Sequence, residues 1–90
     1  MALRYTDAAE ADLLAIVDYG FEQDLPDPIG YVLAIRDRLE QLHSTNMRGR
    51  PSVAVKGARE WVVPPYVVQF YEQGKNAVVL RVLDSRRRFP

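Results

Sequence analysis

The chain of 90 residues is 48% apolar and 27% charged, as expected for one folded domain (residues 1–90). The chain has no cysteine, so it cannot form disulfides or use a thiolate. Its single histidine makes a zinc site unfavourable. Its apolar runs are far shorter than the roughly 20 residues that span a bilayer, and it lacks a signal-peptide pattern, so we expect a soluble, cytoplasmic protein without a metal or a cofactor. The formal net charge is +0, but residues 1–45 are mainly acidic and residues 46–90 are mainly basic. This asymmetry points to a polyanionic or acidic partner for the basic half.

The first third of the chain predicts a short strand and a helix. Residues 2–5 can form a strand, and Thr6 or Asp7 can cap a helix that runs to about Glu22, because a short side-chain oxygen accepts from the free N–H groups of the first turn. The apolar stripe of this helix consists of Ala9, Leu13, Ile16, Val17 and Gly20. The acidic side chains that we expect to be turned away from it, toward solvent, are Glu10, Asp12 and Asp18.

A second helix follows a clear break. Pro26 cannot continue the first helix, and Asp27 followed by Pro28 is typical of a cap with proline at the first helical position. The apolar seam of the second helix consists of Val32, Ile35, Leu39 and Leu42. It should end between His43 and Asn46 and pack antiparallel to the first helix as a helical hairpin. His43 suits the negative end of the helix dipole, and we assign it no catalytic role.

The second half predicts a basic loop and three strands. Residues 47–57 carry two glycines, a proline and several cations, which favours a surface loop. From Arg59 the period becomes two and places Trp61 and Val63 on one face, until Pro64-Pro65 ends the strand.

A β-hairpin follows these prolines. Residues 66–71 form its first strand and residues 73–76 its turn. Residues 77–83 are so continuously apolar that we expect a central strand buried on both faces. The helices would then cover one face of a small antiparallel sheet, an α+β fold with the order β-α-α-β-β-β.

This order of elements over 90 residues resembles the RelE/ParE superfamily of bacterial toxins. The segments that carry the resemblance are, in order, LRYTDAAEADLLAIVDYG, GRP, REWVV, PPYVVQF and VVLRVLDSRRRFP. The ParE branch is the more similar one, through AEADLLAIVDYG, PPYVV and LRVLDSRRRFP. The resemblance implies a RelE/ParE-like fold and the toxin of a type II toxin-antitoxin pair, silenced by a small cognate antitoxin in a hetero-oligomer.

The branch decides which activity is expected. RelE-type members are ribosome-dependent mRNA endonucleases that use lysines and arginines on the sheet with a C-terminal tyrosine or histidine. Here the strand reads Trp61-Val62-Val63, Val67 follows Tyr66 where an arginine is expected, and Phe89-Pro90 follow the last arginines. ParE-type members are understood to poison DNA gyrase, so the resemblance implies gyrase inhibition without catalytic residues. Two alternatives stay open: an mRNA endonuclease that uses arginines alone, and a non-toxic protein-binding module.

We assign binding of the target or the antitoxin to Arg48, Arg50, Arg59, Glu60, Tyr66, Arg81, Arg86, Arg87 and Arg88. Arginine forks can pair with carboxylates or phosphates through two hydrogen bonds. Direct contact with nucleic acid is compatible with this assignment but not required by it.

Each assigned residue also has a structural interpretation. The last three arginines can be a solubilising tail, and Arg48 and Arg50 ordinary loop cations. Arg81 can pair with a carboxylate such as Glu60, and Arg59 and Glu60 can be a solvated strand face.

Apolar side chains have two interpretations as well. The strand aromatics Trp61, Tyr66, Phe70 and Tyr71 favour core packing over stacking on bases. Exposed apolar positions on the helical hairpin, such as Leu14, Phe21 and Leu33, predict a groove for an antitoxin segment.

Overall fold

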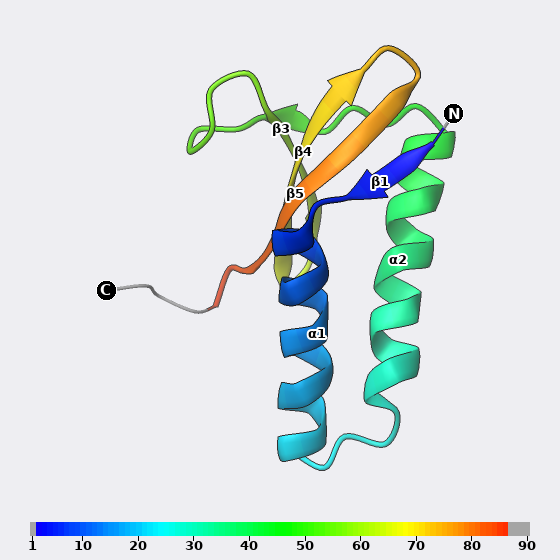
Figure 1. Cartoon of the computed structure of the whole chain (residues 1–90), viewed down its shortest axis with the longest axis vertical. Helices are drawn as coiled ribbons and strands as arrows, with labels where there is room; N and C mark the ends of the chain where they lie inside the picture. The colour runs from blue at the N-terminus through cyan, green and yellow to red at the C-terminus, as the bar shows by residue number, and fades with distance from the viewer. Residues whose placement is uncertain (1, 87–90) are drawn as a thin grey trace.

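The structure, a computed structural model, describes residues 2–86 as two helices and five strands (Figure 1). Their bounds are β1 Leu3–Tyr5, α1 Asp7–Glu22, α2 Pro28–Ser44, β2 Arg50–Pro51, β3 Arg59–Val63, β4 Tyr66–Gln73 and β5 Asn76–Asp84. Neither of the helices in this described part is both long and apolar enough to cross a membrane. The predicted order β-α-α-β-β-β is confirmed, with one additional strand, the two-residue β2.

Both helices begin at the predicted caps. The hydroxyl of Thr6 accepts from the N–H of Ala9 at 3.1 Å and donates to the carbonyl of Leu80 at 2.8 Å, so the same side chain starts α1 and ties it to β5. Asp27 accepts from the N–H of Gly30 at 3.0 Å, and Pro28 takes the first position of α2. The helices then lie side by side as a hairpin (Figure 1).

The sheet has the strand order β1-β5-β4-β3-β2. Strands β3 to β5 pair antiparallel, as predicted, and β2 also pairs antiparallel with β3, but β1 pairs parallel with β5. A parallel pair needs a long crossover, and the helical hairpin between β1 and the rest of the sheet supplies it. The loop predicted for residues 47–57 contains the two-residue strand β2, which pairs with β3 at the sheet edge. The sheet is therefore mixed, with helices on one face.

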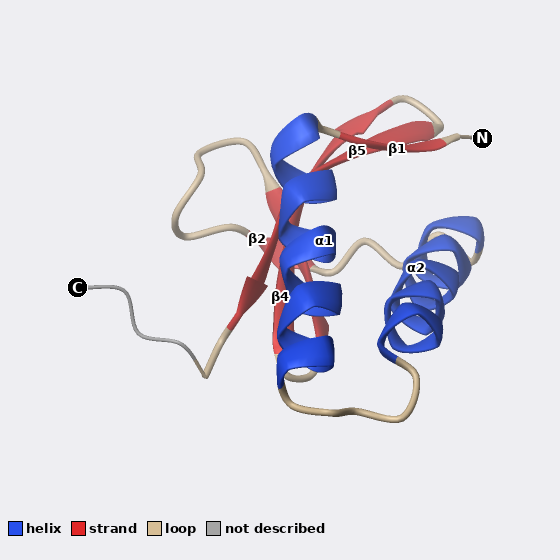
Figure 2. Cartoon of the chain, turned by 60° about the horizontal axis from the view of Figure 1, so that its bottom comes forward, coloured by secondary structure: helices blue, strands red, loops and turns tan. Residues whose placement is uncertain are grey.

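The core lies between the helices and one face of the sheet, which we call the inner face; in Figure 2, α1 runs across it. The rings of Trp61 and Phe70 stack there with centroids 3.7 Å apart. The core residues are Ala9, Leu13, Val32, Ile35, Leu39, Trp61, Tyr66, Val68, Phe70, Ala77, Val79 and Val82. The two helical stripes and the core interpretation of Trp61, Tyr66 and Phe70 are thus confirmed, whereas Tyr71 lies at the surface.

Burial of β5 on both faces was predicted wrongly. Ala77, Val79 and Val82 are buried, but Leu80 and Leu83 are half-buried and Arg81 is exposed. The helices cover only the inner face, and β1 pairs with β5 only as far as Val79. The register with β4 also shifts between Gln69 and Phe70, so that Leu80 forms a bulge. A continuous apolar run does not reveal either feature, because it shows no face preference.

Candidate functional site

The assigned residues that the structure describes fall into two groups. Arg48, Arg50, Arg59 and Glu60 gather where the chain returns from α2 into β2 and β3. Tyr66, Arg81 and Arg86 gather at the end of β5, beside α1. Arg87 and Arg88 lie outside the described residues.

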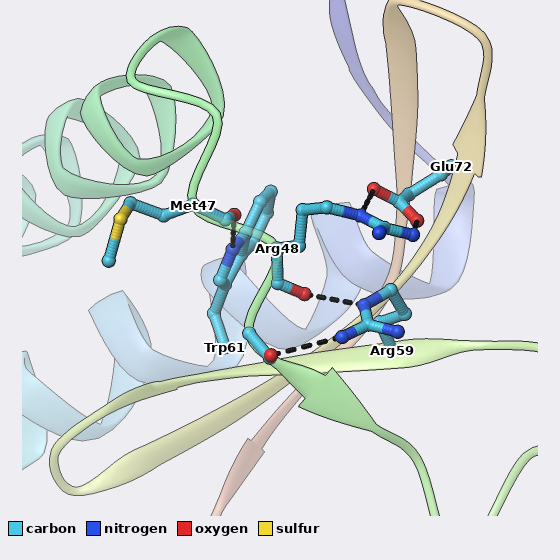
Figure 3. A network of polar contacts seen from close by, with 6 residues as sticks. Met47, Arg48, Arg59, Trp61 and Glu72 are labelled. Atoms are coloured by element: carbon cyan, nitrogen blue, oxygen red, sulfur yellow. Dashed lines mark hydrogen bonds and ion pairs between the residues drawn. The ribbon is translucent and has the colours of Figure 1, made fainter.

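The first group is built on residues 47–50, which we call the strap. The indole N–H of Trp61 donates to the carbonyl of Met47 at 2.6 Å. The guanidinium of Arg59 donates to the carbonyls of Arg48 at 2.6 Å and Gly49 at 3.1 Å (Figure 3). Two side chains of β3 thus hold the strap backbone. Arg59 serves here as a structural donor to the strap backbone.

Arg48 points from the strap toward β4 and pairs with Glu72. Its Nε and Nη2 atoms donate to the two carboxylate oxygens at 2.9 and 2.8 Å, a bidentate pair (Figure 3). The hydrogen bonds from Arg48 lower the pKa of the Glu72 carboxyl and raise the pKa of the guanidinium. This arginine is therefore oriented by an acidic partner on another strand.

Glu60 is 8% exposed and does not belong to a solvated strand face, so that prediction was wrong. Arg50 of β2 donates from Nε to one carboxylate oxygen at 3.1 Å, and the hydroxyl of Ser52 donates to the other at 3.1 Å. A buried carboxylate needs such partners. The side chain of Arg50 remains 62% exposed, so a buried acid holds one end of an exposed cation.

Strand register places four polar residues in one row across the outer face of the sheet. Arg50 lies opposite Glu60, Glu60 opposite Gln69, and Gln69 opposite Arg81. Arg81 does not pair with Glu60 across this row, as one interpretation allowed. It reaches Asp12 of α1 instead, so the predicted ion pair is confirmed with a different partner.

Asp12 was predicted to face solvent, and this was wrong. Its carboxylate accepts from Nε of Arg81 at 2.7 Å, from Nη2 of the same side chain at 3.0 Å, and from the N–H of Val82 at 2.9 Å. Beyond β1, the edge of β5 has a backbone N–H group without a strand partner, and α1 supplies the acceptor. Asp12 on this face of α1 therefore satisfies an N–H group at a sheet edge that no neighbouring strand covers.

Two members of the second group, Tyr66 and Arg86, border a hollow between α1, α2 and the ends of β4 and β5. The hydroxyls of Tyr31 and Tyr66 are 3.2 Å apart, and burial together with this hydrogen bond raises the pKa of Tyr66. Arg86 pairs with Asp84, and its Nε and Nη2 atoms donate to the carboxylate at 3.1 and 2.9 Å. A cavity of about 310 Å³ opens here, lined by Ile16, Tyr19, Gln23, Leu25, Pro28, Tyr31, Tyr66 and Arg86.

Sequence reasoning missed the partners of the assigned cations. Three acids orient assigned arginines: Asp12 orients Arg81, Glu72 orients Arg48 and Asp84 orients Arg86. Ser52 donates to the assigned acid Glu60. No local sequence pattern marks these four partners. Geometrically, both groups present arginines whose direction is fixed by an acid or a carbonyl. Such arginines suit recognition of anionic groups or of protein surfaces.

Comparison with known proteins agrees with this fold. A family model described as ParE toxin of type II toxin-antitoxin system, parDE, matches residues 3–89. The chain is also similar to a solved structure titled "Chromosomal ParDE TA system from P. aeruginosa", with 32% identity and a TM-score of 0.65 over 91% of this chain and 92% of that chain. No curated protein gives a significant match. The family match extends across the two groups of site residues.

Proposed function

The chain belongs to the ParE toxin family of type II toxin-antitoxin systems, and we propose that it acts as a toxin in the cytoplasm, where it inhibits DNA gyrase until a cognate antitoxin neutralises it. The observation that carries the proposal is the family match over nearly the whole chain. The mechanism that we propose is stabilisation of a stalled complex of gyrase and DNA by contacts from oriented arginines.

The geometry of the site supports a binding role. An mRNA endonuclease would need a base and an acid beside a phosphate-binding surface. In the second group Tyr66 shares its hydroxyl with Tyr31, and its raised pKa keeps it protonated, which makes it a poor base. In the first group the carboxylate of Glu60 is occupied by Arg50 and Ser52. These side chains hold one another in place.

We further propose that the antitoxin binds the helical hairpin. Leu14, Phe21 and Leu33 are all exposed, as predicted. Leu14 borders a groove of about 160 Å³ between α1 and α2, lined by Glu10, Leu13, Leu14, Val17, Val32 and Arg36. Apolar side chains of an amphipathic antitoxin segment would bury these positions. An acidic part of the same segment would complement the basic half of the chain.

The proposal is tested by expressing the chain alone in a bacterium and following growth, DNA synthesis, double-strand breaks and mRNA integrity. We expect growth to stop with DNA breaks and halted replication while messages stay intact. Co-expression of the cognate antitoxin should restore growth. With purified gyrase and supercoiled DNA, the chain should increase the cleaved complex in proportion to its concentration.

Other outcomes would replace this proposal. If messages fragment while DNA synthesis continues, the chain is an mRNA endonuclease. If cells grow normally without the antitoxin although the folded chain accumulates, the non-toxic binding module is the better description. The purified gyrase reaction separates a direct effect on the enzyme from a secondary effect on replication.

A further inference from the structure

The turn that joins β2 to β3 is tightly hydrogen-bonded although it projects from the sheet. The N–H of Ser52 donates to the carbonyl of Ala58 at 2.9 Å, and the N–H of Ala58 donates to the carbonyl of Val55 at 3.1 Å. The hydroxyl of Ser52 also accepts from the N–H of Val55 at 3.1 Å. We call residues 52–57 the turn. Its backbone conformation is fixed by its own bonds, so the side chains at its tip have a defined position.

An apolar side chain occupies the tip of this turn. Val53 is 100% exposed. A single exposed apolar residue needs no explanation on its own. Here it stands among cations: residues 47–60 contain four basic side chains, Arg48, Arg50, Lys56 and Arg59, and one acid. That acid is Glu60, which is buried.

Among the three arginines of this region, Arg50 is the one whose hydrogen-bonding groups are most available. Glu60 engages only its Nε, and its two terminal nitrogens have no hydrogen bond within residues 2–86. By contrast, Arg48 and Arg59 each use two nitrogens on protein partners. A buried acid thus fixes the direction of Arg50 while the amino groups of its fork point to solvent. A fork held in this way matches two oxygens of one phosphate.

We propose that the turn and Arg50 form a contact to duplex DNA, with Arg50 on a backbone phosphate and Val53 at the groove. This inference rests on the proposed function and deepens it, because a stalled gyrase complex contains DNA that a toxin can touch directly. Duplex DNA is favoured over an acidic protein segment because the basic side chains flank an apolar tip on an exposed turn. Apolar residues among phosphate-binding cations are a recurring way to contact a DNA groove.

Binding of a fluorescent DNA duplex to the full chain, measured by anisotropy over a range of salt, tests this proposal. We expect salt-dependent binding, and we expect Arg50→Ala to weaken it about fivefold to tenfold and to reduce the log-log salt slope by about 0.9. The matched control is Arg38→Ala, which removes the same charge from an arginine of α2 that donates to Gln41. It should change the affinity less than about twofold, since surface charge distant from the phosphates is screened.

Substitutions of opposite charge at Val53 give a second test that folding cannot confound, because this side chain is wholly exposed. Val53→Glu should weaken binding about threefold or more, and Val53→Lys should strengthen it by a similar factor, since one adds repulsion and the other a phosphate contact. Circular dichroism should be the same for both variants.

The proposal is overturned if Arg50→Ala and Arg38→Ala lose equal affinity, because net charge alone would then explain binding. It is also overturned if the two Val53 variants bind duplex DNA with equal affinity. A third contrary result is that the wild type does not bind duplex DNA, while the turn variants lose binding to gyrase in the absence of DNA. Failure of the proposed function has a different signature. In that case Arg50 would still govern duplex binding, but the wild type would leave gyrase cleavage and supercoiling unchanged.

Discussion

Arg81 on β5 and Asp12 on α1 form a bidentate ion pair across 69 positions of sequence, with N to O distances of 2.7 and 3.0 Å. The two partners differ in burial, since the side chain of Asp12 is 16% exposed and that of Arg81 is 46% exposed. Asp12 also accepts from the backbone N–H of Val82. The acid therefore closes the open edge of β5, while the arginine orients the acid.

Substitution at Asp12 should destabilise the fold more than substitution at Arg81. Asp12→Ala leaves the N–H of Val82 without its acceptor and should lower the free energy of unfolding by about 1–3 kcal/mol. Arg81→Ala removes an exposed partner and should cost about 0–1 kcal/mol. Urea unfolding measures both, and Asp18→Ala, on an exposed face of α1, should stay within about 0.5 kcal/mol of wild type. Equal losses for Asp12→Ala and Asp18→Ala would mean that the edge contact contributes no stability.

Two glycines with the same left-handed backbone should respond differently to alanine. Gly49 has φ +63° and Gly74 has φ +62°. A Cβ at Gly74 meets no atom within 4 Å, whereas at Gly49 it would overlap the backbone carbonyl of Glu60. Gly74→Ala should cost only about 1–2 kcal/mol of conformational strain. Gly49→Ala should cost about 2 kcal/mol more, because the strap must move away from β3. Thermal unfolding of the two variants compares them, and a similar melting temperature would contradict the close approach.

The helices were predictable because their signals are local. Thr6 and Asp27 sit at the helix starts and cap them, and the apolar side chains that follow repeat at helical spacing within a few turns. The hairpin turn was predictable for the same reason: Gly74 lies between two strands and takes a positive φ. The antiparallel pairing of β4 with β5 could be predicted from this turn, because a tight turn joins antiparallel strands.

The partners of the site cations were not predictable, because they depend on long-range geometry. The contact between Asp12 and Arg81 depends on where β1 stops covering β5 and on the bulge at Leu80. The burial of Glu60 depends on Arg50, whose strand has two residues and therefore shows no periodicity. Sequence spacing identified the cationic residues as a class, and the pairing of strands decided which of them have free donors.

The pair of Arg48 and Glu72 predicts an acid-dependent loss of stability. The pKa of Glu72 is lowered below its ordinary value of 4.5, chiefly by the hydrogen bonds from Arg48. A lowered native pKa gives stability that is present above the ordinary value and is lost as pH falls through the lowered one. Wild type should therefore lose its stability advantage over Glu72→Gln when pH falls from about 6 to about 3.

Melting temperatures at several pH values measure this difference, which should be small because both side chains are partly exposed. High salt should reduce it further by screening. Glu22→Gln, at the end of α1, is the control. Its difference in stability from wild type should not change with pH in this way, because Arg48 pairs with Glu72. If the difference between wild type and Glu72→Gln stays constant with pH, the pair does not favour the ionised carboxylate.

The helical hairpin predicts a variant that separates neutralisation from toxicity. Leu14 is 61% exposed at the rim of the groove between α1 and α2, so Leu14→Asp should leave folding intact. Burying a carboxylate against apolar antitoxin side chains is unfavourable, and we expect the affinity for the antitoxin to fall at least about tenfold. Cells that co-express this variant with the antitoxin should stop growing, whereas cells with Leu14→Met should be protected. Isothermal titration with purified antitoxin gives the affinities directly. A carboxylate buried at this contact must weaken binding. If Leu14→Asp and wild type bind the antitoxin with equal affinity, the antitoxin therefore binds another surface.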